Sequence, residues 1–110
     1  MKLVITGSRG IENRQAIWAI LDKHQFDTLI HGGARGVDRI AGQYAQAKGI
    51  KEVVLKPNWR LGRGAAMANN AKMAEIGDAL VAIHDGVSAG TAHMVDTMRK
   101  LGKPVDYNVL

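Results

Sequence analysis

Short apolar runs alternate with helical patterns along the whole chain of 110 residues. The runs are rich in β-branched residues, and the segments between them place apolar residues three or four positions apart. The predicted strands are Lys2–Thr6, Asp27–His31, Glu52–Lys56, Ala79–His84 and Val105–Val109. The predicted helices are Asn13–Lys23, Val37–Lys48, Ala65–Ile76 and Thr91–Leu101. This alternation predicts an α/β fold, with a five-stranded, mainly parallel sheet and helices on both faces.

The length bounds the number of domains. A chain of 110 residues is the size of one domain, and no repeat, linker or low-complexity segment interrupts it. We therefore expect residues 1–110 to fold as one unit.

A glycine-rich stretch joins the second predicted strand to the following helix. Gly32, Gly33 and Gly36, with one arginine among them, lie between Ile30 and Asp38. Glycines let the backbone approach an anion closely, and a helix N-terminus points free N–H groups toward it. The pattern is neither the dinucleotide fingerprint nor a Walker loop. It is therefore compatible with a phosphate cradle and with a simple tight turn.

Arginines gather where the predicted strands end. Arg9, Arg35, Arg60 and Arg63 all follow strands, whereas the loops that precede the strands hold two lysines and no arginine. Ligands of parallel α/β sheets bind at the carboxyl ends of the strands. Because the arginine fork suits bidentate phosphate binding, this placement favours a phosphate site there.

Composition narrows the classes of partner and site. The net charge of +5 favours an anionic partner, and there is no cysteine for a disulfide or a thiolate nucleophile. The four histidines match no zinc spacing, so we expect no metal site. No stretch approaches the length of a membrane span, so we expect a soluble, cytoplasmic protein without a membrane partner.

Several polar side chains are open to two interpretations. Asp38 suits the first turn of its helix, and it could also bind a ribose hydroxyl. Ser8, Ser88 and Thr91 could donate to a phosphate, while Thr91 also suits the N-cap of the last helix. Asn69 and its neighbour could point into the crevice or form an exposed polar face.

Three segments together resemble a known family. Val4–Arg9, His31–Asp38 and Gly90–Val95 resemble, in order and spacing, the YspA-like family of the SLOG superfamily, and the resemblance spans essentially the whole chain. This superfamily includes the Lonely Guy phosphoribohydrolases and DNA-processing protein A. The resemblance implies a Rossmann-like fold, a bacterial or phage origin and a homo-oligomer. It also implies a nucleotide-derived ligand, such as ADP-ribose or an NAD derivative.

The resemblance and the arginine placement together give a set of expected ligand-binding residues. They are Gly7, Ser8, Arg9, Gly32, Gly33, Ala34, Arg35, Gly36, Asp38, Arg63, Asn70, Gly90 and Thr91. The chain departs from the pattern at two positions. Asn69 stands where the family usually has arginine, and Met94 stands where the Lonely Guy enzymes carry a glutamate. A methionine cannot act as an acid or a base.

These features favour a binding or sensing protein over an enzyme, with a nucleotide-type ligand and no required cofactor. One alternative is an N-glycosidase or phosphoribohydrolase in which Asp38 or Asp85 replaces the missing glutamate. Another is a single-stranded DNA-binding protein, suggested by the charge and by the likeness to DNA-processing protein A. The scarcity of aromatic residues counts against nucleic acid, because single-strand binders usually stack bases on rows of rings.

Overall fold

The computed structural model describes residues 1–86 and 88–110, with the side chain of Arg63 outside the described part. Its strands are β1 (Lys2–Gly7), β2 (Thr28–His31), β3 (Lys51–Val54), β4 (Ala79–His84) and β5 (Val105–Val109). Its helices are α1 (Arg14–Leu21), α2 (Val37–Lys48), the 3₁₀ segment η1 (Trp59–Gly64), α3 (Ala65–Ile76) and α4 (Ala89–Lys100). The strands form one wholly parallel sheet in the order β3-β2-β1-β4-β5. The predicted α/β fold is confirmed.

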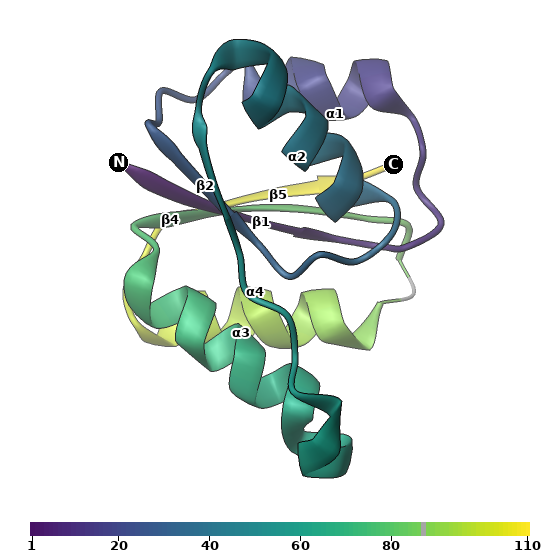
Figure 1. The fold of residues 1–110 in the computed structure, drawn as a ribbon, viewed down its shortest axis with the longest axis vertical. Helices are drawn as coiled ribbons and strands as arrows, with labels where there is room; N and C mark the ends of the chain where they lie inside the picture. Colours follow the sequence, from purple (N-terminus) through teal and green to yellow (C-terminus); the bar gives the residue numbers. More distant parts are fainter. Residues whose placement is uncertain (87) are drawn as a thin grey trace.

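The sheet lies between two helical layers (Figure 1). Helices α1 and α2 cover one face, and α3 and α4 cover the other. Alternate residues of β1 serve the two layers, since Leu3 and Ile5 belong to the α1–α2 core and Val4 belongs to the α3–α4 core. All six residues of β4 are buried, as expected for a central strand covered on both faces.

The strand order creates a crevice between β1 and β4. β1 leads into α1 on one face, while the neighbouring β4 leads into α4 on the other. The two connections therefore diverge at the carboxyl ends of these strands. Such a switch point is where open parallel sheets bind their ligands.

Some boundaries differ from the predicted ones, each for a local reason. The last helix begins at Ala89, because the Oγ atom of Ser88 accepts a hydrogen bond from the N–H of Thr91 at 3.2 Å. The N-cap is therefore Ser88, and the prediction of Thr91 was wrong. The third strand ends at Val54, since β2 ends at His31 and offers no strand beyond it. The segment predicted as loop 57–64 contains η1, which Asn58 caps.

No helix in the described residues is long and apolar enough to cross a membrane.

Candidate functional site

A cavity of about 520 Å³ opens at the carboxyl ends of β1, β2 and β4. The predicted ligand-binding residues that line it are Gly7, Ser8, Arg9, Gly32, Ala34, Asp38, Asn70, Gly90 and Thr91. Gly33 and Arg35 line a smaller adjoining cavity of about 300 Å³, in which Arg9 and Ala34 also take part. The prediction at Arg63 concerns a side chain outside the described part of the chain. The switch point thus brings most of the expected residues together.

The glycine loop after β2 is held by two of its neighbours. The Oδ2 atom of Asp38 accepts hydrogen bonds from the N–H groups of Gly32 (3.1 Å) and Ala34 (3.2 Å). The Nδ1 atom of His31 accepts from the N–H of Gly33 at 3.0 Å. These three N–H groups, which a phosphate cradle would offer to an anion, therefore make bonds within the loop. Any phosphate here needs other donors.

The loop bonds also fix the state of His31. Because its Nδ1 accepts a hydrogen bond, its proton lies on Nε2, which donates to the Oε2 atom of Glu52 at 2.6 Å. This hydrogen bond lowers the pKa of Glu52 below its ordinary value. His84 repeats the arrangement after β4, since its Nδ1 accepts from Gly86 and its Nε2 donates to the hydroxyl of Tyr107. Both strand-end histidines therefore shape turns.

Asp38 is a buried carboxyl group at the cavity wall. Only 6% of the residue is exposed, and burial raises the pKa of its carboxyl, although the loop N–H groups and the charge of Arg9 act in the opposite direction. Both loop bonds use Oδ2. The second oxygen, Oδ1, remains for the cavity that Asp38 lines. Asp38 therefore organises the glycine loop from the wall of the cavity.

Ser8 and Asp85 tie the loop after β1 to the loop after β4. The hydroxyl of Ser8 donates to Oδ1 of Asp85 at 3.1 Å and accepts from the N–H of Asp85 at 3.2 Å. The backbone N–H of Ser8 also donates to the carbonyl of Ile83 at 3.1 Å. The hydroxyl that we expected to reach a phosphate thus already links the two loops.

The N-terminus of α4 forms the opposite wall of the cavity. Ala89, Gly90 and Thr91 line it, and the side chain of Ser88 caps the helix. The Nδ2 atom of Asn70 donates to the carbonyl of Gly90 at 3.2 Å, which fixes α3 against this helix start. The positive end of the α4 dipole therefore faces the cavity, where it favours an anion.

Two of the predicted glycines have clear packing roles. A Cβ atom on Gly36, whose φ is +73°, would lie 2.5 Å from the carbonyl oxygen of Arg9. A Cβ atom on Gly7 would lie 2.3 Å from the carbonyl oxygen of Ile83. Both positions require glycine because backbone from another segment passes too close for any side chain.

Trp59 and Asn69 are among the cavity residues that lie outside the predicted set. Trp59, in η1, is 61% exposed and lines both the main and the adjoining cavity. Asn69 is buried, and its Nδ2 atom donates to the carbonyl of Leu55 at 2.5 Å, so it supports the segment after β3. The sequence signal for Trp59 was a lone aromatic residue between a proline and two arginines, at the end of a strand.

A family model and a phage protein both match this chain. The model of the YspA, cpYpsA-related SLOG family matches residues 1–62. The chain belongs to this family. Gene 61 protein of Mycobacterium phage D29 is 32% identical over 116 aligned positions, which cover 94% of this chain and 93% of the phage protein. No solved structure matches the chain. Membership of the SLOG family suggests a nucleotide-related ligand.

Proposed function

We propose that this SLOG protein binds a nucleotide or nucleotide-derived ligand, of the ADP-ribose or NAD-derivative class, in the cavity between β1 and β4. The observation that carries the proposal is that an anion-favouring helix N-terminus and an exposed aromatic ring line the same cavity. The N-terminus of α4 and Arg9 lie in the same cavity as the exposed indole of Trp59. A nucleotide has the same two parts, a phosphate and a flat base.

The phosphate would lie between Arg9 and the first turn of α4. The N–H groups of Gly32, Gly33 and Ala34 are engaged within their loop, so side-chain cations and helix ends are the remaining donors. Arg35 lines the adjoining cavity together with Arg9, which gives an extended phosphate chain a second guanidinium. Charge-assisted bonds of this kind are about twice as strong as neutral ones.

The sugar and the base would occupy the rest of the cavity. Oδ1 of Asp38 would accept a hydrogen bond from a ribose hydroxyl, since both loop bonds use Oδ2. The exposed face of Trp59 suits stacking with a base, which contributes about 1–3 kcal/mol for each base in single-strand binders. We favour binding over turnover, since Ser8 and Asp85 are engaged with each other.

A thermal-shift panel tests the proposal. It holds AMP, ADP, GTP, NAD, ADP-ribose and a short single-stranded oligonucleotide. A ligand at 100 times its Kd adds about 2.7 kcal/mol, which raises the Tm of a domain of this size by about 10 °C or more. We expect such a shift with at least one nucleotide, and its loss in Arg9→Gln. A shift with the oligonucleotide alone would favour single-stranded DNA binding instead.

A second candidate function is hydrolysis of an N-glycosidic bond. The observation that favours it is Asp38, a buried carboxyl group with a raised pKa beside the cavity. A raised pKa suits a general acid at neutral pH. This function predicts release of free base from a bound nucleotide, detected by chromatography, and loss of that release in Asp38→Asn. Bound nucleotide recovered intact after long incubation would exclude it.

A further inference from the structure

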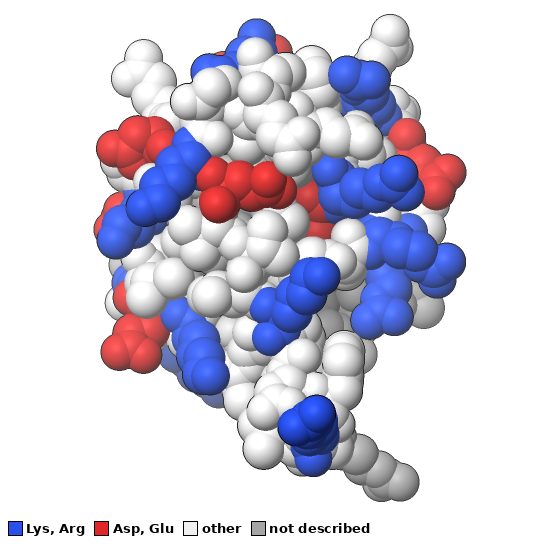
Figure 2. Space-filling model, in the orientation of Figure 1, with Lys and Arg blue, Asp and Glu red and all other residues white. Residues whose placement is uncertain are grey.

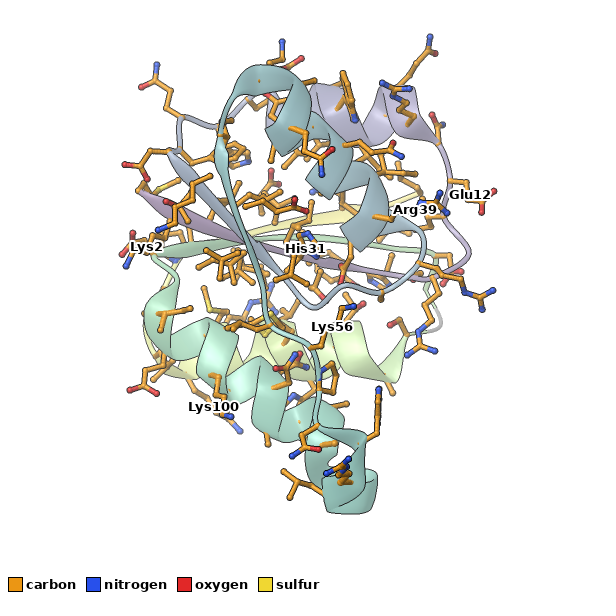
Figure 3. All side chains as sticks on the ribbon, viewed as in Figure 1. Lys2, Glu12, His31, Arg39, Lys56 and Lys100 are labelled. Atoms are coloured by element: carbon orange, nitrogen blue, oxygen red, sulfur yellow. The ribbon has the colours of Figure 1, made fainter. Side chains whose placement is uncertain are left out.

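A second cavity, of about 450 Å³, lies beside the glycine loop, on the outer side of α2 and β3. Its cations are Arg35, Arg39 and Lys56. Figure 3 shows Arg39 on α2 and Lys56 after β3, on either side of the loop that joins β2 to α2. In Figure 2, Lys and Arg gather over this side of the molecule. Arg39 and Lys56 both lie outside the predicted set of ligand-binding residues.

The charge of this cavity is positive and largely uncompensated. Arg35, Arg39 and Lys56 take part in no ion pair within the described residues. Glu52 is the carboxylate in the lining, and both of its oxygens are occupied, Oε2 by His31 at 2.6 Å and Oε1 by Gln46 at 3.3 Å. Three cations therefore face the cavity against one carboxylate whose oxygens are already hydrogen-bonded.

The second cavity is a neighbour of the adjoining cavity, which is in turn a neighbour of the main one. It shares Gly33, Ala34, Arg35 and Lys56 with the adjoining cavity of about 300 Å³. That adjoining cavity in turn shares Arg9 and Trp59, among others, with the main cavity. The three cavities are therefore neighbours, and residues of the glycine loop contribute to the lining of each.

We propose that the cavity of Arg35, Arg39 and Lys56 binds a second phosphate group of the same ligand. This inference rests on the proposed function and narrows its ligand class to nucleotides that carry two phosphate groups at separate positions. Such ligands include a 2′,5′- or 3′,5′-bisphosphate and a dinucleotide with an additional ribose phosphate. The two guanidinium forks supply bidentate donors, and Lys56 supplies a point charge.

Calorimetry with matched pairs of ligands tests this inference. The pairs are AMP with adenosine 2′,5′- and 3′,5′-bisphosphate, and NAD with NADP. The variant is Arg39→Gln, because Arg39 lines the second cavity and neither of the others. The control is Arg99→Gln, an exposed arginine in the last turn of α4.

We expect the bisphosphate or NADP to bind at least tenfold more tightly than its partner. Arg39→Gln should reduce this ratio to about twofold or less without changing the Kd of AMP or NAD, and Arg99→Gln should change neither. Equal affinities within each pair, or a ratio that persists in Arg39→Gln, would overturn the second phosphate site while leaving the nucleotide site intact. Absence of binding by all of these nucleotides would overturn both.

Discussion

The Oδ2 atom of Asp38, in the first turn of α2, accepts a hydrogen bond from the N–H of Ala34 at 3.2 Å. The same oxygen accepts the N–H of Gly32. One side chain thus sets the shape of the loop whose sequence is compatible with a phosphate cradle or a tight turn. The loop is arranged before any ligand arrives, and its donors are turned toward the protein.

Replacing Asp38 should separate this loop role from the charge of the carboxylate. Asp38→Ala leaves two N–H groups without their acceptor, and we expect a loss of about 2–3 kcal/mol in the free energy of unfolding. Asp38→Asn keeps an oxygen that can accept both bonds, so its loss should stay below about 1 kcal/mol. Urea unfolding at neutral pH measures both values. Equal losses in the two variants would contradict the role of the acceptor oxygen.

The raised pKa of Asp38 gives its contribution a defined pH dependence. The folded protein holds the proton more tightly than the unfolded chain, whose aspartate pKa is about 3.9. The contribution of this group to stability is therefore largest below that value and falls as pH rises toward the folded pKa. We expect the free energy of unfolding, wild type minus Asp38→Asn, to decrease as pH is raised from about 4. A difference that does not change with pH would refute the direction of the shift.

Gly7 and Gly90 provide a matched pair of glycine substitutions at the cavity. A Cβ atom on Gly7 would meet the backbone of Ile83, which cannot move aside, so Gly7→Ala should cost about 3 kcal/mol or more. A Cβ atom on Gly90 meets nothing within 4 Å. Gly90→Ala should therefore leave the Tm unchanged or raise it slightly, since alanine favours a helix by up to about 1 kcal/mol. A Tm for Gly7→Ala close to that of the wild type would contradict the packing argument.

Tyr44 should lose its proton at an unusually high pH. Its hydroxyl donates to Oδ1 of Asp22 at 2.6 Å, and burial together with this carboxylate raises the pKa of Tyr44 to about 12. Its contribution to stability is complete below about pH 10, the ordinary pKa of tyrosine, and is lost as pH rises toward 12. The absorbance at alkaline pH, wild type minus Tyr44→Phe, should show this midpoint. A midpoint near 10 would show that the hydroxyl is not held by Asp22.

Some helices and strands whose ends are set by local residues were predicted from the sequence with their observed bounds. Helix α2 was predicted with its observed bounds, because Gly49 adopts the left-handed conformation that stops it. Strand β4 was also predicted in full, as an apolar run long enough for a buried strand. The start of α4 was missed because Ser88 and Thr91 are both good caps, and only the path of the chain decides between them.

The location of the site was predicted more fully than the contacts between its residues. Strand-end loops of a parallel sheet must meet at one edge, so the clustering of Arg9, Asp38 and Gly90 follows from the fold. The bond between Ser8 and Asp85 joins residues 77 positions apart, and no local pattern reports it. Trp59 was missed because an exposed ring in an irregular segment has no periodicity to mark it.

The most direct test is fluorescence of Trp59 in a Trp18→Phe background, with ADP-ribose and AMP as probes. The background change removes the other tryptophan while it keeps an aromatic ring beside Tyr44. We predict saturable quenching of Trp59 by a nucleotide, with the Kd raised at least tenfold by Arg9→Gln. Unchanged Trp59 emission at millimolar concentrations of both probes would contradict a nucleotide site in this cavity.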